Sequence, residues 1–275
     1  MGEYPFLKGH GTENDFLLLP DHDGTIHGDL SPEEMAARVR ALCDRHAGLG
    51  ADGVLRVVRD GDRWFMDYRN ADGSLSEMCG NGIRVFARYL VDEGLVDPAR
   101  PFKVDTRDGP KLLDVDGQHV TVDLGEALVL GETKVSVGDR TWTATHVDMG
   151  NPHAVALVED EAALAGLDLR RPPEHDPARY PDGVNVELVV RRGEVHVGMR
   201  VHERGSGETR SCGTGAGAVM VATAVADGAD PTVTGRQAMY RVDVPGGMLA
   251  VTWSPEGRVY LTGPAVVVAR GTISL

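Results

Sequence analysis

Alternating hydrophobic and polar positions cover much of this 275-residue chain and predict a protein rich in strands. Val, Leu and Thr alternate with polar residues over 102–137 and again over 140–158, and short Gly- and Asp-containing pairs interrupt both stretches. The alternation is typical of strands with one buried face, and the interrupting pairs are typical of tight turns. We therefore expect successive strands and hairpins in both stretches.

Three further segments show a helical pattern. Ser31 followed by Pro32 predicts a helix over 32–42, with Ser31 as its N-cap and Pro at its first position. Residues 82–91 place apolar side chains three and four positions apart, as in a buried or amphipathic helix. Residues 216–226 are apolar on every side, so we expect a helix enclosed by strands.

The remaining segments complete the expected order of elements. We predict a strand over 6–19 that is broken by a polar turn at 9–15, and short strands at 53–58 and 64–68. We also predict a loop at 170–177, an end to the second buried helix at 227–231, strands again over 232–242, and a last strand over 266–275 that fits either sheet.

Two cysteines occupy near-identical settings. Cys79 stands in Met-Cys-Gly-Asn-Gly and Cys212 in Ser-Cys-Gly-Thr-Gly, about half the chain apart, and each precedes an apolar helical stretch. The repeat indicates an internal duplication that gives each half one thiol. Because a helix N-terminus favours the thiolate, we expect the pKa of both thiols to fall below the ordinary value of ~8.5.

The glycines beside the thiols extend this chemistry. They let the backbone approach a ligand closely, so the amides of Gly80, Asn81, Gly213 and Thr214 can form a nest for an α-carboxylate. Two thiols acting on one carbon can remove a proton from one face and return it on the other, and convergent N–H donors would stabilise the charge that develops. Cys43 lacks this context and is interpreted as a buried, inert thiol.

Composition removes several other classes of function. The formal net charge is −14 with scattered Lys and Arg, which argues against a nucleic-acid or anionic-membrane partner. The amino terminus shows no export signal, and three cysteines without a Cys-x-x-Cys pair argue against a disulfide framework or a structural zinc site, so we expect a cytoplasmic protein. The four lysines lie outside any Gly-rich phosphate cup, so we expect no pyridoxal phosphate and no other cofactor.

Several blocks together resemble the diaminopimelate epimerase family. They are Lys8-Gly-His-Gly-Thr-Glu-Asn14-Asp-Phe16, Asn70-Ala-Asp-Gly73, Cys79-Gly-Asn-Gly82, Gly150-Asn-Pro-His153, Asn185-Val186, and Glu203-Arg-Gly-Ser-Gly-Glu-Thr209 before Cys212. The resemblance implies a cofactor-independent isomerase of lysine and peptidoglycan precursor biosynthesis, which converts LL-2,6-diaminopimelate into the meso form. It also implies a homodimer.

The same resemblance implies a fold. The expected class is α/β (α+β), with two pseudo-symmetric domains, each a barrel-like sheet wrapped around a central helix. Residues 1–118, joined by the last strand at 264–275, would form the half that carries Cys79, and residues 119–263 the half that carries Cys212. The active site is expected in the cleft between these halves.

Family positions map onto this chain residue by residue. Cys79 and Cys212 would be the acid and base thiols, and His153 would orient the substrate or tune a thiol, although a structural role for His153 remains open. The substrate-binding residues would be Asn14, Asn70, Gly80, Asn81, Asn151, Asn185, Glu203, Arg204, Gly213 and Thr214. A clamp on a distal carboxylate suits Arg204, and an ammonium partner suits Glu203; surface ion pairing is the alternative for both.

Two positions depart from the common family pattern, and two other functions remain open. Glu13 stands where many members have Gly, and Gly53 stands where many have a substrate-contacting Gln, so that contact is not carried over. One alternative is a pyridoxal-independent racemase or epimerase of another amino acid, similar to proline racemase. The other is an amino-acid-binding protein in which Cys79 and Cys212 form a regulatory disulfide.

Overall fold

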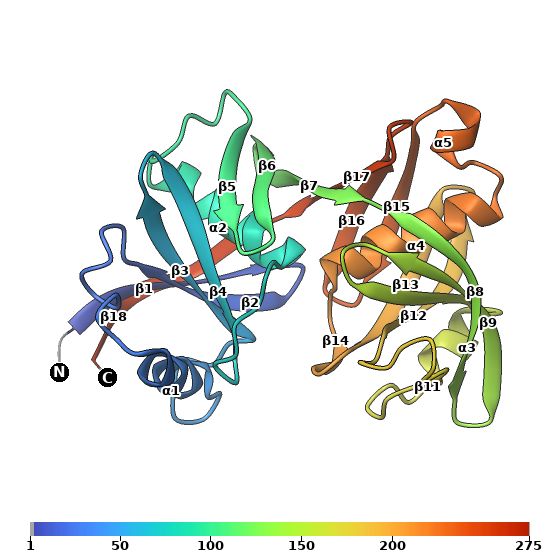
Figure 1. Cartoon of the computed structure of the whole chain (residues 1–275), viewed down its shortest axis with the longest axis horizontal. Coiled ribbons are helices and arrows are strands. Elements are labelled where there is room, and N and C mark those ends of the chain that lie inside the picture. Colours follow the sequence, from blue (N-terminus) through green and yellow to red (C-terminus); the bar gives the residue numbers. More distant parts are fainter. Residues whose placement is uncertain (1–2, 275) are drawn as a thin grey trace. The chain divides into compact units, whose positions relative to one another are not determined.

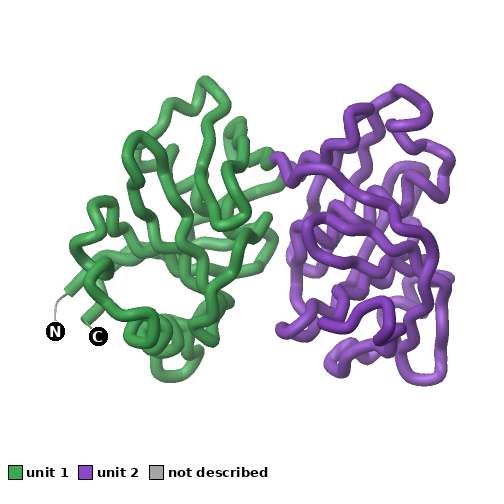
Figure 2. The backbone as a smooth tube through the Cα atoms, in the orientation of Figure 1, with its two compact units in different colours: residues 1–122, 263–275 green, residues 123–262 purple. Residues whose placement is uncertain are grey.

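The computed structural model describes residues 3–274, which fall into two compact units. The first unit combines Met1–Val122 with Gly263–Leu275, and the second is Asp123–Thr262 (Figure 2). These limits lie within a few residues of the halves expected at 1–118 with 264–275 and at 119–263. The predicted strand-rich α/β (α+β) class is confirmed, since strands far outweigh helices in both units.

The first unit contains strands at both ends of the chain. Its elements are β1 (Glu3–Gly11), β2 (Asn14–Pro20), α1 (Pro32–Cys43), β3 (Gly53–Asp60), β4 (Arg63–Asn70), α2 (Gly80–Asp92), β5 (Phe102–Thr106), β6 (Gly109–Asp116) and β18 (Val266–Ser274) (Figure 1). Strand β7 (His119–Glu126) leaves this unit and β17 (Arg258–Pro264) returns to it.

The second unit repeats this plan with additions. Its elements are β8 (Leu128–Val137), β9 (Arg140–Asp148), β10 (Pro152–Leu157), α3 (Glu161–Ala165), β11 (Glu174–His175), β12 (Asn185–Gly193), β13 (His196–Glu203), β14 (Gly207–Thr209), α4 (Gly213–Ala226), α5 (Pro231–Thr234), β15 (Ala238–Val244) and β16 (Gly247–Trp253).

Strand pairing follows the same sequence of directions in the two units. In the first, β18, β1, β2, β3, β4, β5 and β6 are neighbours in that order, antiparallel except for β2–β3 and β4–β5. In the second, β8, β9, β10, β12, β13, β15 and β16 are neighbours, antiparallel except for β10–β12 and β13–β15. A topology repeated to this extent supports the duplication inferred from the two cysteine motifs.

One helix lies at the centre of each unit (Figure 1). In the first unit α2 contacts β1, β2, β3, β4, β6 and β18, and in the second α4 contacts β9, β10, β12, β13, β15 and β16. Most residues of both helices are buried, as the apolar sequence of 216–226 predicted. Each central helix also connects a pair of parallel strands, β4 to β5 and β13 to β15, which cannot be joined by a tight turn.

Helix α1 begins as predicted. Ser31 is its N-cap and accepts a hydrogen bond from the Glu34 amide, while the Glu34 side chain accepts one from the Ser31 amide. The buried face of α1 packs with Leu17 and Val54 from β2 and β3. This small hydrophobic cluster holds α1 against β2 and β3.

The structure corrects two predicted boundaries and settles a third. The broad turn expected at 9–15 is a two-residue hairpin turn, because β1 continues to Gly11 and β2 begins at Asn14. Strand structure resumes at Ala238 rather than at residue 232, because the segment Pro231–Thr234 is the short helix α5 with Asp230 as its N-cap. The last strand, β18, pairs with β1 and so closes the first unit.

Among residues 3–274, every helix falls short of the length and apolar character that a membrane-spanning helix needs.

Candidate active site

Cys79 is the N-cap of the central helix in the first unit. Its backbone is extended, and its Sγ accepts a hydrogen bond from the Gly82 amide at 3.4 Å. Gly80 and Asn81 are therefore the first two residues of α2, where an α-helix offers no internal acceptor for the backbone N–H groups. The side chain is partly exposed, as a reactive thiol requires.

Cys212 has the same geometry in the second unit. It is the N-cap of α4, and its Sγ accepts a hydrogen bond from the Gly215 amide at 3.3 Å. Gly213 and Thr214 begin the helix, and the Thr214 hydroxyl lies 3.7 Å from Sγ. The predicted placement of both thiols at helix starts is confirmed. The two sites also share the same capping hydrogen bond, from the amide three residues further on to the sulfur.

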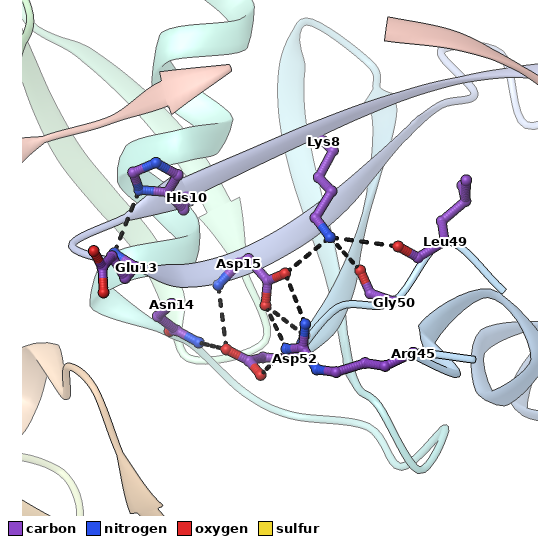
Figure 3. Close-up of polar contacts among 9 residues, drawn as sticks. All are labelled: Lys8, His10, Glu13, Asn14, Asp15, Arg45, Leu49, Gly50 and Asp52. Atoms are coloured by element: carbon purple, nitrogen blue, oxygen red, sulfur yellow. Dashed lines mark hydrogen bonds and ion pairs between the residues drawn. The ribbon is translucent and has the colours of Figure 1, made fainter. Parts of the chain in front are cut away.

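Asn14 lies beside Cys79 and is held in one orientation. Its Nδ2 donates to Asp52 Oδ2 at 2.8 Å (Figure 3). Its Oδ1 accepts from Asn81 Nδ2 at 3.1 Å. Because a carboxylate only accepts, the contact with Asp52 fixes which end of the Asn14 amide is which. The Asn14 Oδ1 consequently faces the thiol, 3.7 Å from Cys79 Sγ.

Asp52 belongs to a network of ion pairs within the first unit (Figure 3). Arg45 Nη2 lies 2.7 Å from Asp52 Oδ1 and 2.8 Å from Asp15 Oδ1. Lys8 Nζ lies 3.1 Å from Asp15 Oδ2 and donates to the Gly50 carbonyl at 2.6 Å. Several charges joined in this way hold their side chains better than one exposed ion pair does.

Arg84 is a fully buried cation within α2, four residues after Gly80. Its guanidinium donates to the Gly80 carbonyl at 3.2 Å and to Thr12 Oγ1 at 3.3 Å, whereas its Nε has no partner among the described residues. Burial lowers its pKa to about 10, and the attraction of Cys79 opposes that shift. The side chain therefore stays charged at neutral pH and adds to the positive potential of the helix N-terminus.

Cys212 has the opposite electrostatic surroundings. It is only 5% exposed, and burial raises the pKa of its thiol well above the ordinary range, with Glu203 and Glu187 adding to the shift. The expectation that the helix start would lower this pKa is therefore wrong for Cys212, because desolvation and two nearby carboxyl groups outweigh the helix terminus. Glu203 accepts hydrogen bonds from Thr209 and Cys212, and burial raises its own pKa.

His153 and Glu187 form a buried pair on neighbouring parallel strands. Both are 0% exposed, and His153 Nδ1 lies 2.7 Å from Glu187 Oε1. On the other side of the ring, His153 Nε2 lies 3.0 Å from Asn151 Oδ1. The structure therefore places His153 in contact with one predicted substrate-binding residue, Asn151.

The other predicted residues are anchored by their own units. Asn70 accepts from the Tyr68 hydroxyl at 2.8 Å and donates to Ser74 Oγ at 3.0 Å. Asn185 donates to the Pro152 carbonyl at 3.1 Å and accepts from the Arg204 amide at 2.9 Å, so it ties the Arg204 backbone to the start of β12. The Arg204 side chain is exposed, and its Nη1 lies 3.4 Å from the Asp182 carbonyl.

The two departures from the common family pattern have structural counterparts. Glu13 has φ +62°, in the left-handed region where glycine is unstrained. A Cβ on Gly53 would lie 2.6 Å from the Arg69 carbonyl and 2.8 Å from the Tyr68 ring. No side chain fits there, and the Tyr68 ring occupies that space while its hydroxyl holds Asn70.

Sequence reasoning missed four residues near these sites: Asp52, Tyr68, Arg84 and Glu187. Two of them carried a usable signal. Arg84 is a cation in the middle of an otherwise apolar helical stretch, and Glu187 is the one polar residue within 186–190. Charged residues are almost never fully buried unless they are paired, so both positions could have been marked as unusual. Within residues 3–274, no three His, Cys, Asp or Glu side chains group as metal ligands.

Comparison with known sequences places the chain in a family. The family model described as Diaminopimelate epimerase matches residues 6–130 and 145–268. The chain belongs to the diaminopimelate epimerase family. A relative with that name from Streptomyces coelicolor is 58% identical over 97% of this chain and 94% of its own length. Another from Mycolicibacterium smegmatis is 47% identical over 98% of this chain and 96% of its own length.

Solved structures share the fold at much lower identity. A PhzF-family phenazine biosynthesis protein from Bacillus anthracis aligns with a TM-score of 0.76 at 14% identity over 100% of both chains. A hydroxyproline epimerase from Agrobacterium vitis aligns with a TM-score of 0.66 at 15% identity, over 99% of this chain and 93% of its own. These likenesses establish the two-unit architecture as one shared with other proteins.

Proposed function

We propose that this protein is an isomerase that epimerises LL-2,6-diaminopimelate to the meso form without a cofactor, in lysine and peptidoglycan precursor synthesis. Membership of the diaminopimelate epimerase family supports the substrate. The observation that carries the mechanism is the duplicated thiol geometry, in which Cys79 and Cys212 cap the central helices through the same hydrogen bond. Two matched thiols suit a reaction that moves a proton from one face of a carbon to the other.

In the proposed reaction Cys79 acts as the thiolate base and Cys212 as the thiol acid. The Cys79 thiolate takes the α-proton, and the C–H electron pair passes into the adjoining carboxylate. Cys212 then donates its proton to the opposite face, which leaves it as the thiolate. The raised pKa of Cys212 and the buried Arg84 near Cys79 support this direction of transfer.

The carboxylate next to the reacting carbon gains negative charge during proton removal, and hydrogen-bond donors directed at it would stabilise that charge. The first two amides of each helix, at Gly80 and Asn81 and at Gly213 and Thr214, are suited to that role. A donor of this kind is typically worth about 3 kcal/mol in other enzymes. The remaining amino-acid head would be bound by Asn14, Asn70, Asn151, Asn185, Glu203 and Arg204.

The decisive experiment uses reduced protein in deuterated water with LL-diaminopimelate and no added cofactor. We expect meso product that carries deuterium at a single α-carbon, observed by NMR and mass spectrometry. Absence of both exchange and product would refute the proposed function. Equal turnover of proline would instead favour a racemase of broader specificity.

Replacing either thiol tests the two-thiol mechanism. Cys79→Ala and Cys212→Ala should each lower kcat/KM by at least about 1000-fold, and the double variant should be no worse than either single one, because both thiols serve the same reaction. Steady-state kinetics on the three proteins measure this, with Cys43→Ala as the control. A single variant that keeps substantial activity would exclude the mechanism.

The proposal extends to the assembly and the compartment of the protein. The family resemblance supports a homodimer, which sedimentation at several protein concentrations would test. Cys43, Cys79 and Cys212 form no disulfide in the structure, in keeping with a reducing cytoplasm. A concentration-independent monomer would contradict the first proposal, and a secreted location of the native protein would contradict the second.

A further inference from the structure

Glu187 is an unusual residue for its position. It lies near the start of β12, where the first six residues are all buried, and its neighbours along the strand are Val186 and Leu188. A carboxyl group in such a place is costly unless it is fully paired. Replacing a buried ionisable pair by well-packed apolar residues is often neutral for stability, so stability alone gives no reason for the His153–Glu187 pair.

The hydrogen bonding of Glu187 is one-sided. Its Oε1 contacts His153 Nδ1 at 2.7 Å, while its Oε2 is buried with no partner among the described residues. An unsatisfied buried acceptor typically costs about 1–3 kcal/mol. The buried carboxyl group therefore lowers the stability of the fold, and among residues 3–274 its one hydrogen-bond partner is His153.

Both ring nitrogens of His153 face oxygen atoms. Nδ1 faces Glu187 and Nε2 faces Asn151 Oδ1 at 3.0 Å. With Asn151 Oδ1 facing the ring, Nε2 is the donor, because an amide oxygen only accepts. The contact between Nδ1 and Oε1 then needs one more hydrogen, held by either atom, and the pair is neutral overall in both cases.

We infer that Glu187 is a positioning residue, which acts through His153 to fix the Asn151 side chain with its Oδ1 toward the ring and its Nδ2 left to donate. This inference rests on the proposed function in one respect, since it makes Asn151 Nδ2 a donor to a carboxylate of the amino-acid substrate. Without Glu187 the ring can exchange its tautomers, and the Asn151 amide loses its fixed orientation.

The start of α4 leaves room for this arrangement. A Cβ on Gly215 would lie 2.7 Å from Glu187 Oε1 and 3.1 Å from Cys212 Sγ. Glycine at this position lets the carboxyl group and the thiol approach the same helix turn. The positioning pair is therefore packed directly beside the proposed acid.

Two variants separate hydrogen bonding from charge. Glu187→Leu removes the partner of Nδ1, and we expect kcat/KM for diaminopimelate to fall about 10- to 100-fold, mainly through KM, because Nδ1 is left buried without a partner and the ring loses its fixed position. Glu187→Gln can donate its amide to Nδ1 and should stay within about threefold of the unchanged protein. Glu194→Leu, at an exposed position just beyond β12, is the matched control.

The spectroscopic readout does not depend on activity. In ¹⁵N NMR spectra of histidine-labelled protein, we expect Nε2 of His153 to carry hydrogen in the unchanged protein and in Glu187→Gln, and to exchange between tautomers in Glu187→Leu. Glu187→Leu should lower the thermal midpoint, because it leaves the buried Nδ1 of His153 without a partner, whereas Glu187→Gln should keep the midpoint. A role in stability alone would lower the midpoint and leave the His153 tautomer and kcat/KM unchanged.

Three outcomes would overturn the inference. They are an Nε2 without hydrogen in the unchanged protein, unchanged kinetics in Glu187→Leu, and a Glu187→Gln variant as impaired as Glu187→Leu. If the unchanged protein fails to epimerise diaminopimelate, the proposed function fails by itself, whereas the NMR spectra still decide whether Glu187 sets the His153 tautomer.

Discussion

At the scale of single residues, backbone strain and buried charge mark the positions around the candidate site. Thr12 and Glu13 both have positive φ in the turn between β1 and β2, and Asn14 follows directly. A left-handed conformation costs an ordinary L-residue about 1–2 kcal/mol. The two residues form a tight turn whose twist matches that of the two strands. The turn places Asn14 next to Cys79.

Relief of this strain is a direct test. Glu13→Gly should raise the free energy of unfolding by about 1 kcal/mol, because glycine adopts φ +62° without strain. Urea denaturation measures the change. Glu13→Ala also removes the carboxylate but keeps the strain, so it should show no gain; equal stabilisation by Ala and Gly would show that the side chain, and not the backbone, is responsible.

At the scale of elements, the two central helices begin alike but rest against different neighbours. Gly82 and Gly215 occupy the same third position in α2 and α4. A Cβ on Gly82 would meet the end of the Leu55 side chain at 3.2 Å, whereas a Cβ on Gly215 would meet the Glu187 carboxyl group at 2.7 Å. The helix start in the second unit is thus much less tolerant of added volume.

The matched pair Gly82→Ala and Gly215→Ala tests this difference. Gly215→Ala should lower the free energy of unfolding by about 2 kcal/mol and reduce kcat/KM at least tenfold, because the carboxyl group held by His153 must move. Gly82→Ala should cost less, since a Leu55 methyl group can shift. Urea denaturation and kinetics of both variants give the comparison, and a larger stability loss in Gly82→Ala would contradict it.

At the scale of the whole molecule, the ends of the chain meet in one unit. Strand β1 pairs with β18 from Glu3 and Ser274 to His10 and Val266. The first unit is therefore complete only when the last nine-residue strand has returned, and its folding depends on contacts across the full sequence. The second unit is a continuous segment and has no such dependence.

The stability of the whole chain should depend on pH through His27. This side chain is 2% exposed, and burial, with help from Arg38 and Arg56, lowers its pKa to about 4 while Asp21 opposes the shift. A histidine whose folded pKa is depressed adds stability that is complete above its unfolded value near 6.5 and is lost as the pH falls toward 4. The loss should approach about 3 kcal/mol.

Urea denaturation at pH 7.5, 5.5 and 4.5 measures this dependence. In His27→Gln the free energy of unfolding should fall less steeply between pH 6.5 and 4.5, whatever its value at pH 7.5. His119→Gln, at an exposed position, should keep the slope of the unchanged protein. Identical slopes in all three proteins would assign the acid sensitivity to other groups.

The sequence by itself determined the features that repeat over a few residues. The alternation over 102–158 indicated strands, the apolar run at 216–226 indicated a central helix, and the motifs around Cys79 and Cys212 marked the starts of both helices. Each of these depends on local periodicity or on capping chemistry, which neighbouring residues encode.

Only the tertiary structure decided burial and charge around the two thiols. Arg84 is buried within α2, and Glu187 on β12 lies near Cys212 at the start of α4. The pKa of Cys212 therefore rises where the local motif alone predicted a fall. The same folding placed β18 on β1. Desolvation and strand pairing depend on residues far apart in the sequence, so no local pattern contains them.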